Sequence, residues 1–378
     1  MIINPFQKNK PIIYLIIITY FCAFSVFMSF SSELISWYHE NKRELPWRSS
    51  KNPYHIWLSE IMLQQTRVAQ GLSYYLTFTE TFPTVFDLAN ADEQLVLKLW
   101  QGLGYYSRAR NLHFTAKHIA ENLNGEFPSD FKSLKELKGV GDYTASAIAS
   151  IAFNQPNAVV DGNVYRVLAR IFGIDTPINS TAGIKEFKAL AQSLIDRKQP
   201  GTFNQAIMDF GATQCKPVNP DCGSCPFRDT CLANKEQKQE VLPVKLKKTK
   251  VRNRYFNYLV ILTENGKTQL NQRTSKGIWQ NLYEFPLIES DTYIKEEELI
   301  SSSDFKNLSF ADYEISLFNE KPVVHKLSHQ HLHTQFWILE TKSYDNANVL
   351  WSEIQDYPVP VLIANFLKQF SSNIKSFL

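Results

Sequence analysis

A lone carboxylate, Glu60, lies in the apolar segment PYHIWLSEIMLQQTRV, between Trp57 and Leu63. Burying an ionised carboxylate without a partner is costly, so such a group shifts its pKa upward and keeps its proton. A carboxyl group that is protonated near neutral pH can act as a general acid. The alternative is that Glu60 lies at the solvent edge of an amphipathic helix, and this segment alone favours that alternative.

Four of the five cysteines form one cluster with the spacing C-x6-C-x2-C-x5-C. Four thiolates this close in sequence can enclose one metal centre. Disulfides need an oxidising compartment and usually join more widely separated cysteines. The spacing therefore predicts a metal site, and the residues alone leave zinc and an iron–sulfur cluster open. The predicted ligands are Cys215, Cys222, Cys225 and Cys231.

Two glycine-containing segments, LKLWQGLGYYS and LKELKGVGDYT, repeat one pattern. Each predicts a helix, a Gly-apolar-Gly hairpin and a second helix. In the second copy the hairpin consists of Gly139, Val140 and Gly141. Successive backbone N–H groups at the start of the following helix make an anion site. A tight helix–helix turn without a ligand is the alternative, and two copies in a basic region favour phosphate binding.

The elements that must position these groups are mainly helical in the first part of the chain. From residue 33 to 171, apolar residues recur at three- and four-residue spacing, with short breaks marked by glycine or proline. A second helical stretch runs from 184 to 211. After a basic linker at 235–254, the runs YFNYLVILT and TQFWILET are β-branched and aromatic. They predict a mixed α/β domain at 255–378.

Charge is unevenly distributed along the 378 residues, although the net charge is only +3. Up to Arg254 there are 30 basic and 22 acidic residues, a net of +8, and the remainder has 10 and 15, a net of −5. A basic first part with an acidic appendage fits a polyanion-binding module that carries a second domain. The length also favours two domains.

Residues 1–27 differ from the rest of the chain. No residue from 11 to 32 is charged, and IIYLIIITYFCAFSVFMSF is long enough to cross a bilayer. A signal peptide or membrane anchor is the direct interpretation. We favour a working start at Met28, with Ser31 or Ser32 as the cap of a first helix. No membrane partner is expected unless the extension belongs to the working protein.

Together these features resemble the helix-hairpin-helix DNA glycosylases, and within them the adenine DNA glycosylases of the MutY type. The resemblance covers nearly all of 28–378. It rests on LPWR, WLSEIMLQQT, GLGYYSRARNL, LKGVGDYTASA, VVDGNVYRVLAR, FNQAIMDFGA and the cysteine spacing. It implies a mainly α helix-hairpin-helix glycosylase domain at 28–234, with an iron–sulfur loop at 215–231, and an α/β Nudix-like domain at 255–378. It also implies one [4Fe–4S] cluster per chain rather than zinc.

The residue after the second hairpin separates two reaction types in this family. Bifunctional relatives such as endonuclease III have a lysine there, which attacks the sugar and forms a Schiff base. This chain has Tyr143 at that position, and Lys138, which precedes the hairpin, is not equivalent. A tyrosine cannot form an imine, so the resemblance implies a monofunctional glycosylase.

Hydrolysis of a deoxyadenosine N-glycosidic bond needs an acid at the leaving base and a carboxylate beneath an oxocarbenium-like sugar. Glycosidases solve the same pair of problems with two carboxylates. The resemblance assigns the acid to Glu60 and the sugar carboxylate to Asp161, with Tyr143 and Asn163 orienting them. Asp161 also has the sequence setting of a helix N-cap. Both roles are compatible, because the N–H groups of a cap keep a carboxylate ionised.

An adenine inside a duplex must be flipped out before it can react. The resemblance implies that Gln205 hydrogen-bonds the flipped base, with Trp47 and Arg48 nearby. Packing or ordinary surface exposure is the alternative for each contact residue. The resemblance also implies that Gln65 and Tyr105 fill the gap left in the base stack, and that Leu103 and Thr66 contact the opposite base.

The C-terminal segment resembles the Nudix-like domain of the same family. RTSKGIWQNLYEFP is similar to the approach to a Nudix box, but the box is absent, so we expect neither pyrophosphatase activity nor catalytic magnesium. The family recognises 8-oxoguanine through a Phe-Ser-His loop. Here KLSHQHLH has Leu327 in place of phenylalanine and keeps Ser328 and His329. The other histidines of this segment are interpreted as surface residues rather than metal ligands.

The resemblance therefore implies a base-excision repair enzyme that removes adenine opposite 8-oxoguanine or guanine in double-stranded DNA. The expected protein is a monomer of the bacterial cytoplasm. A bifunctional glycosylase for oxidised pyrimidines is disfavoured by the missing lysine and by the long C-terminal domain. A non-catalytic iron–sulfur DNA-binding protein would have lost the acid and aspartate positions, and both are present.

Overall fold

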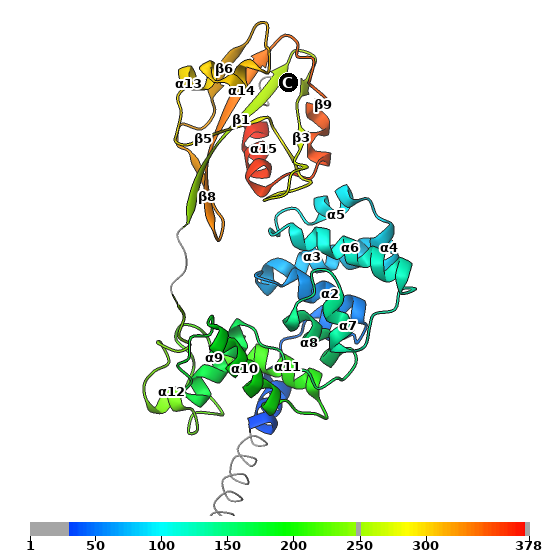
Figure 1. Ribbon diagram of the computed structural model, residues 1–378, viewed down its shortest axis with the longest axis vertical. Coiled ribbons are helices and arrows are strands. Elements are labelled where there is room, and N and C mark those ends of the chain that lie inside the picture. Colours follow the sequence, from blue (N-terminus) through cyan, green and yellow to red (C-terminus); the bar gives the residue numbers. More distant parts are fainter. Residues whose placement is uncertain (1–29, 247–250, 375–378) are drawn as a thin grey trace, which may run out of the picture. The chain divides into compact units, whose positions relative to one another are not determined.

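The computed structural model describes residues 30–246 and 251–374 (Figure 1), and the predicted extension at 1–27 lies outside them. Within these ranges no helix has both the length and the apolar character needed to span a membrane. Backbone contacts divide the chain into two compact units. Unit 1 contains residues 1–64 and 121–247, and unit 2 contains 65–120 and 248–378. The domain boundaries that the sequence analysis drew at 234 and 254 stay predictions.

Unit 1 is helical. A first helix covers residues 30–41. The buried faces of the later helices share one core, in which Val167 and Leu168 pack with Phe203 and Phe210. The elements of this unit are η2 (Pro46–Arg48), α2 (Pro53–Met62), α7 (Phe131–Glu136), α8 (Asp142–Ile151), α9 (Gly162–Phe172), α10 (Thr181–Leu194), α11 (Pro200–Asp209), the π-helical turn η3 (Phe210–Gln214) and α12 (Leu232–Lys235).

Side-chain caps and turn residues explain where several of these helices begin and end. Asn52 caps α2, which has Pro53 at its first position, where a missing N–H costs nothing. Ser180 caps α10 through the backbone N–H of Gly183. Helix α9 ends at Gly173, whose φ of 67° lies in the left-handed region that glycine adopts without strain. Local chemistry thus fixes the ends of the helices that carry the site.

Unit 2 combines helices with a sheet. Its elements are α3 (Val68–Thr81), α4 (Val85–Asn90), α5 (Glu93–Leu99), α6 (Ser107–Asn122), β1 (Arg252–Thr263), β2 (Lys267–Thr268), β3 (Asn271–Gln272), β4 (Tyr283–Glu284), β5 (Leu287–Ser290), α13 (Glu296–Ser301), α14 (Ser303–Lys306), β6 (Glu314–Leu317), β7 (Val323–Lys326), β8 (Gln330–Thr341), β9 (Val349–Leu350), η4 (Trp351–Asp356) and α15 (Val361–Ile374).

The main sheet has the order β5-β1-β8-β6, and β7 pairs with β8. Strands β1 and β8 are parallel along their whole length. Alternate side chains face two layers, as a strand requires. Leu259 packs with Leu299 of α13, whereas the rings of Phe336 and Phe366 of α15 stack with centroids 4.2 Å apart. The sheet therefore lies between α13 and α14 on one face and α15 on the other, in agreement with the predicted α/β domain.

Hydrogen bonds join residues 65–120 to the C-terminal residues within unit 2. Gln101 Oε1 accepts from the backbone N–H of Val359 at 3.1 Å, and the nitrogen of Lys98 donates to the carbonyl of Tyr357 at 3.3 Å. Arg110 donates to the carbonyl of Gln280 at 2.8 Å. These contacts explain why a helical segment from the first part of the chain belongs to the unit of the sheet.

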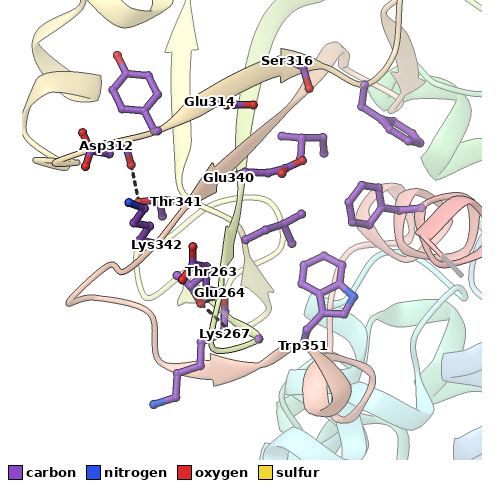
Figure 2. A pocket seen from close by; sticks show the side chains of 16 residues that line it. Thr263, Glu264, Lys267, Asp312, Glu314, Ser316, Glu340, Thr341, Lys342 and Trp351 are labelled. Atoms are coloured by element: carbon purple, nitrogen blue, oxygen red, sulfur yellow. Dashed lines mark hydrogen bonds between the residues drawn. The ribbon is translucent and has the colours of Figure 1, made fainter. Parts of the chain in front are cut away.

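A cavity of about 830 Å³ opens on the α15 face of the sheet (Figure 2). Phe318, Trp351 and Phe370 form its apolar part, and the cross-strand partners Glu314 and Glu340 lie at its polar side. Within the described ranges, no group of three or more His, Cys, Asp or Glu side chains is arranged to hold an ion. The expectation that this domain lacks pyrophosphatase activity still depends on the missing Nudix box and stays a prediction.

Candidate active site

Glu60 lies on α2 and is buried, with 8% of its surface exposed, so the solvent-edge alternative does not hold. Burial is the main cause that raises its pKa, to about 7. A hydrogen bond with Tyr143 and the charge of Arg48 lower this pKa, whereas the charge of Asp161 raises it. A carboxyl group in this setting holds a proton near neutral pH and can transfer it.

Asp161 caps α9 and accepts three hydrogen bonds. Its Oδ1 accepts from the backbone N–H groups of Asn163 at 2.9 Å and Val164 at 2.8 Å, and its Oδ2 accepts from Asn163 Nδ2 at 2.9 Å. Burial raises the pKa of Asp161 overall, and these donors, together with Arg166, oppose that rise. The upward direction of this pKa departs from the expectation that the N–H groups of the cap keep the carboxylate ionised. Even so, all three donors bind the ionised form best.

Tyr143 lies on α8 and interacts with both carboxyl groups. Burial is the first cause that raises its pKa well above 10, and the charges of Glu60 and Asp161 raise it further. The phenol therefore stays protonated and donates to Met208 Sδ at 3.0 Å. The hydroxyl group can rotate its proton towards Glu60, and a bond donated to the ionised carboxylate is the reason why Tyr143 lowers the pKa of Glu60.

A buried ion cluster of Arg43, Arg48 and Asp209 lies near Glu60, whose pKa responds to the charge of Arg48. Arg48 donates to both oxygens of Asp209, at 2.5 and 2.6 Å, and Arg43 donates through Nε to Oδ1 at 3.0 Å. The carboxylate of Asp209 is fully buried. Burial by itself raises the pKa of Asp209, but the hydrogen bonds and charges of Arg48 and Arg43 outweigh this effect, so the pKa is lowered. Trp47, which precedes Arg48 in η2, is a buried ring with 6% exposure.

Helix α11 presents three side chains to this region from one face. Met208 and Asp209 follow Gln205 by three and four residues, the spacing of neighbours on one face of a helix. Gln205 Oε1 accepts from the hydroxyl of Tyr38 at 2.8 Å. The sequence analysis missed Tyr38, Arg43, Met208 and Asp209. A signal existed for Asp209, which, like Glu60, is a lone acid in an apolar segment, NQAIMDFGA.

The second glycine hairpin connects α7 and α8 as predicted. Gly139 has φ 84°, and Gly141 is the N-cap of α8 with φ −92°. Both glycines are exposed, whereas Val140 is buried. A Cβ added at Gly141 would meet no atom within 4 Å, so the backbone there is open to a ligand. An exposed helix N-terminus of this type suits a phosphate group.

The first hairpin has a different conformation and lies in unit 2. Gly104 and Tyr105 both have positive φ, 77° and 48°, and α6 begins only at Ser107. The guanidinium of Arg108 donates to the carbonyls of Leu103 and Gly104 and to Thr66 Oγ1. This hairpin therefore directs carbonyl groups at a cation, and the expectation of a second anion site there was wrong.

Arg108 also joins the two loops that contain the implied DNA contacts of unit 2. Tyr105 is 47% exposed and Gln65 is exposed, and both have positive φ, 48° and 56°. Non-glycine residues rarely adopt this conformation, which concentrates at functional sites. Leu103 is buried, with 4% exposure. Gln65 and Tyr105 are therefore exposed side chains on backbone of constrained conformation, whereas Leu103 is buried two residues before Tyr105.

Ser328 and His329 form the tip of the β7–β8 hairpin. The backbone N–H of Leu327 donates to the carbonyl of Gln330 at 2.8 Å and closes the turn. Both tip side chains are exposed, and Ser328 Oγ lies 3.3 Å from His329 Nδ1. A polar pair at the tip of a two-stranded projection can reach a ligand surface. Leu327 is only partly buried.

The four clustered cysteines line one small cavity, with Arg170 and Phe210. Burial is the main cause that raises the pKa of the Cys225 thiol, to about 12, and the other three cysteines raise it further. Arg170 donates to Cys215 Sγ at 3.4 Å. Four thiols that oppose one another's ionisation fit a cationic centre, because metal ions stabilise thiolates. No set of ligands for one ion is present among the described residues.

Family models match both parts of the chain. The model described as "HhH-GPD superfamily base excision DNA repair protein" matches residues 58–199, and the NUDIX domain model matches residues 257–369. A solved structure of a thermostable thymine-DNA glycosylase is 28% identical, with a TM-score of 0.52, and the match covers 56% of this chain and 97% of that one. The fold and these matches define a helix-hairpin-helix DNA glycosylase, a hydrolase of N-glycosyl bonds, with a Nudix-like domain.

Curated relatives identify the family more closely. The adenine DNA glycosylase of Buchnera aphidicola subsp. Acyrthosiphon pisum is 33% identical over 356 residues, which cover 91% of this chain and 98% of the relative. The adenine DNA glycosylase of Homo sapiens is 46% identical over 223 residues, 57% of this chain and 41% of the relative. The chain belongs to the adenine DNA glycosylase family, and the family predicted from the sequence is confirmed.

Proposed function

We propose that the protein removes adenine mispaired with 8-oxoguanine or guanine, by hydrolysing the N-glycosidic bond of a flipped-out deoxyadenosine. The name of its relatives supports adenine as the base. The observation that carries the proposal is the coupling of Glu60, Asp161 and Tyr143 in one buried site, where the pKa of Glu60 is raised to about 7. A neutral acid and an anion are the pair that this reaction needs.

Glu60 is the proposed acid. Its proton is transferred to the leaving adenine as the glycosidic bond breaks, so the base departs neutral rather than as an anion. The hydrogen bond between Tyr143 and Glu60 orients the carboxyl group. Arg48 lies close enough to lower the pKa of Glu60 and stabilises the carboxylate that remains after the transfer.

Asp161 is the proposed partner of the sugar. As the bond breaks, positive charge develops on the deoxyribose, and the ionised carboxylate stabilises it before water completes the hydrolysis. Asn163 holds this carboxylate through its backbone N–H and its Nδ2. No lysine follows the second hairpin. The sugar therefore forms no imine, and the strand is left with an abasic site.

The proposed base and DNA contacts follow the resemblance. Gln205 faces the flipped adenine with Trp47 and Arg48, and Ser328 with His329 reads the 8-oxoguanine. The exposed side chains on constrained backbone support the role of the unit 2 loops in filling the stack. The other proposed contacts are Gln65, Thr66, Leu103 and Tyr105 for the stack and the opposite base, and Gly139, Val140 and Gly141 for a phosphate.

The clustered cysteines are the proposed ligands of one [4Fe–4S] cluster. The cluster, when bound, supplies metal–thiolate bonds that cross-link the loop to itself. The chain contributes Arg170, which donates to Cys215 Sγ and to the carbonyls of Lys216 and Pro217 and so fixes the loop against α9. Iron content and visible absorption of the purified protein test this assignment.

The test of the proposed function is release of adenine from a duplex with adenine opposite 8-oxoguanine. Purified protein is incubated with the duplex, and half of each sample is treated with hot alkali. Strand cleavage only after alkali is the expected result. Cleavage without alkali, or on oxidised pyrimidines, would indicate a bifunctional enzyme, and no cleavage at all would contradict the proposal.

The variant Glu60→Gln tests the acid. It is expected to bind the mispaired duplex as tightly as the unchanged protein and to lose at least about 1,000-fold in single-turnover rate, the scale of a general acid. In the unchanged protein this rate should decline as the pH rises above about 7, because Glu60 then loses its proton. Release of adenine by the variant at an unchanged rate would exclude Glu60.

A further inference from the structure

The chain between α8 and α9 reaches Asp161 without regular secondary structure. Residues 154–160 lie in this connection, and none of them belongs to a helix or a strand. The buried N–H and carbonyl groups of such a segment must still be paired. Val159, which precedes Asp161 by two residues, is buried, with 1% exposure. The hydrogen-bond partners of this segment therefore influence where the Asp161 carboxylate lies.

Asn204, on α11, supplies two of these partners. Its Oδ1 accepts from the backbone N–H of Val159 at 3.1 Å, and its Nδ2 donates to the carbonyl of Asn157 at 2.8 Å. Nδ2 also donates to Ser150 Oγ at 2.8 Å. A backbone N–H can only donate and a backbone carbonyl can only accept, so the two ends of this amide cannot be exchanged. The orientation of the Asn204 side chain is therefore fixed by the backbone that it holds.

A second amide binds the alternate residues of the same segment. Gln192, on α10, accepts from the backbone N–H of Ala158 at 3.1 Å and donates to the carbonyl of Pro156 at 2.7 Å. The two amides differ in their surroundings, because Gln192 is exposed and Asn204 is fully buried. Water can replace an exposed partner, whereas loss of a buried partner leaves backbone groups unsatisfied. Asn204 therefore holds the segment more strongly than Gln192 does.

Helix α11 also carries Gln205, which faces the flipped adenine in the proposed function. One helix thus holds the proposed base contact directly and the segment of the proposed sugar carboxylate through Asn204. We propose that Asn204 is a positioning residue that sets the distance between the Asp161 carboxylate and the sugar of the flipped nucleotide. The rate depends steeply on this distance, because a misplacement of about 1 Å costs about 100-fold. The inference rests on the proposed function, in which Asp161 stabilises positive charge on the sugar.

The first experiment compares two unreactive duplexes, each with a nucleotide analogue opposite 8-oxoguanine. One analogue has a protonated pyrrolidine ring in place of the sugar, and the other has a neutral tetrahydrofuran ring. The ratio of the two affinities measures the preference of the site for positive charge at the sugar. Both titrations use the same preparation, so the ratio does not depend on the fraction of the protein that is folded. The unchanged protein should prefer the cation, and Asp161→Asn should lose most of this preference.

For Asn204→Ala we expect the preference for the cation to fall by about tenfold, because the carboxylate is no longer held in place. Single-turnover release of adenine should fall by about 100-fold. Asn204→Ser, whose side chain is one bond shorter than the amide, serves if Asn204→Ala does not fold. A preference that is unchanged in the Asn204 variants, with stability lost, would mean that Asn204 has only a structural role and would overturn the inference.

Ser150→Ala is the matched control for stability. Ser150 is buried, with 1% exposure, and its hydroxyl accepts from Asn204 and donates to the carbonyl of Ala147 rather than to the segment. This variant should lose stability and keep the preference. Gln192→Ala should change the preference by less than about twofold, because water replaces its exposed bonds. A fall in either control as large as that in Asn204→Ala would contradict the role of Asn204.

The second experiment places Asn204→Ala in the Asp161→Asn background. With no carboxylate to position, the change at Asn204 should alter the preference by less than about twofold, since two residues that act through one interaction are not additive. A further tenfold fall, on the scale of about 1.4 kcal/mol, would show that Asn204 acts on the sugar by another route. Thermal unfolding should show the stability loss of Asn204→Ala in both backgrounds.

The outcomes separate this inference from the function on which it rests. If the unchanged protein shows no preference for the cation, or if Asp161→Asn keeps that preference, the proposed role of Asp161 fails. If the preference depends on Asp161 and not on Asn204, only the positioning role fails.

Discussion

The two buried carboxylates Glu60 and Asp209 differ in one respect, the presence of a paired cation. Arg43 and Arg48 bind Asp209 directly, and the pKa of that carboxyl is lowered. Glu60 has no such pair, and its pKa is raised to about 7. The same burial therefore produces an anion in one place and a neutral acid in the other.

This difference predicts how Glu60 affects stability. Between pH 4.5, its ordinary pKa, and about 7, the folded protein holds a proton that the unfolded chain has lost. The stability contributed by Glu60 therefore falls as the pH rises through this window and is constant above it. Glutamine does not titrate, so Glu60→Gln removes this dependence on pH. The free energy of unfolding of the variant minus that of the unchanged protein should therefore be about 2 kcal/mol larger at pH 8 than at pH 5. Urea denaturation at both pH values measures it.

Glu44→Gln is the matched control, because the Glu44 side chain is 88% exposed. It should change the free energy of unfolding by a similar small amount at both pH values. An equal gain from Glu60→Gln at pH 5 and pH 8 would show that Glu60 is ionised in the folded protein across this range.

The sequence identified Glu60 but not its counterpart, and the reason is physical. Both acids lie in apolar segments, but the segment of Glu60 alone favoured the solvent edge of a helix, and the resemblance to a family assigned the acid. Asp209 is paired with residues 161 and 166 positions away, and such pairing depends on how the helices pack. For the same reason the bond between Tyr38 and Gln205 could not be predicted, although both residues are plain in the sequence.

At the scale of elements, Asp161 combines a structural and a proposed chemical role at the start of α9. Asparagine caps a helix about as well as aspartate, whereas alanine does not. We therefore expect Asp161→Asn to fold with a free energy of unfolding at least about 1 kcal/mol above that of Asp161→Ala. Both variants should lose release of adenine. Denaturation curves and single-turnover assays measure the two effects.

The control for this comparison is Ser180→Ala, which removes the cap of α10. It should cost about 1 kcal/mol of stability and leave the rate unchanged. Normal turnover by Asp161→Asn would contradict the proposed role of the charge, whereas equal stability of the two Asp161 variants would contradict the role of the cap.

The two hairpins show what a sequence pattern settles about an element. Both copies predict a turn with glycine at fixed positions, and both form one. Only the second has the open N-terminus of a helix, because Gly141 has φ −92° and directly precedes α8. In the first, Tyr105 adopts a φ of 48° and α6 begins only at Ser107. Arg108 donates hydrogen bonds to the carbonyls of Leu103 and Gly104. A buried arginine after the motif was the distinguishing residue.

For the whole molecule, the sequence predicted the change from helical to α/β structure but not the two units. Composition and periodicity report local structure, so they identified the sheet and the helices. The grouping of 65–120 with the C-terminal residues depends on hydrogen bonds such as that between Gln101 and Val359, 258 positions apart. The proposed acid and aspartate lie in unit 1, and the proposed lesion-reading hairpin tip lies in unit 2.

This division predicts that selectivity and overall DNA affinity can be changed separately. His329→Ala removes a proposed base contact, so preference for adenine opposite 8-oxoguanine over adenine opposite guanine should fall about tenfold, with an unchanged salt dependence of binding. Lys138→Gln removes a basic side chain that directly precedes the second hairpin, the proposed phosphate site. It should weaken binding to both duplexes equally and reduce the slope of log K against log salt by about 1. Binding titrations between 50 and 200 mM salt, a range of ordinary use, measure both quantities. A change of slope in His329→Ala, or of preference in Lys138→Gln, would contradict this assignment of roles.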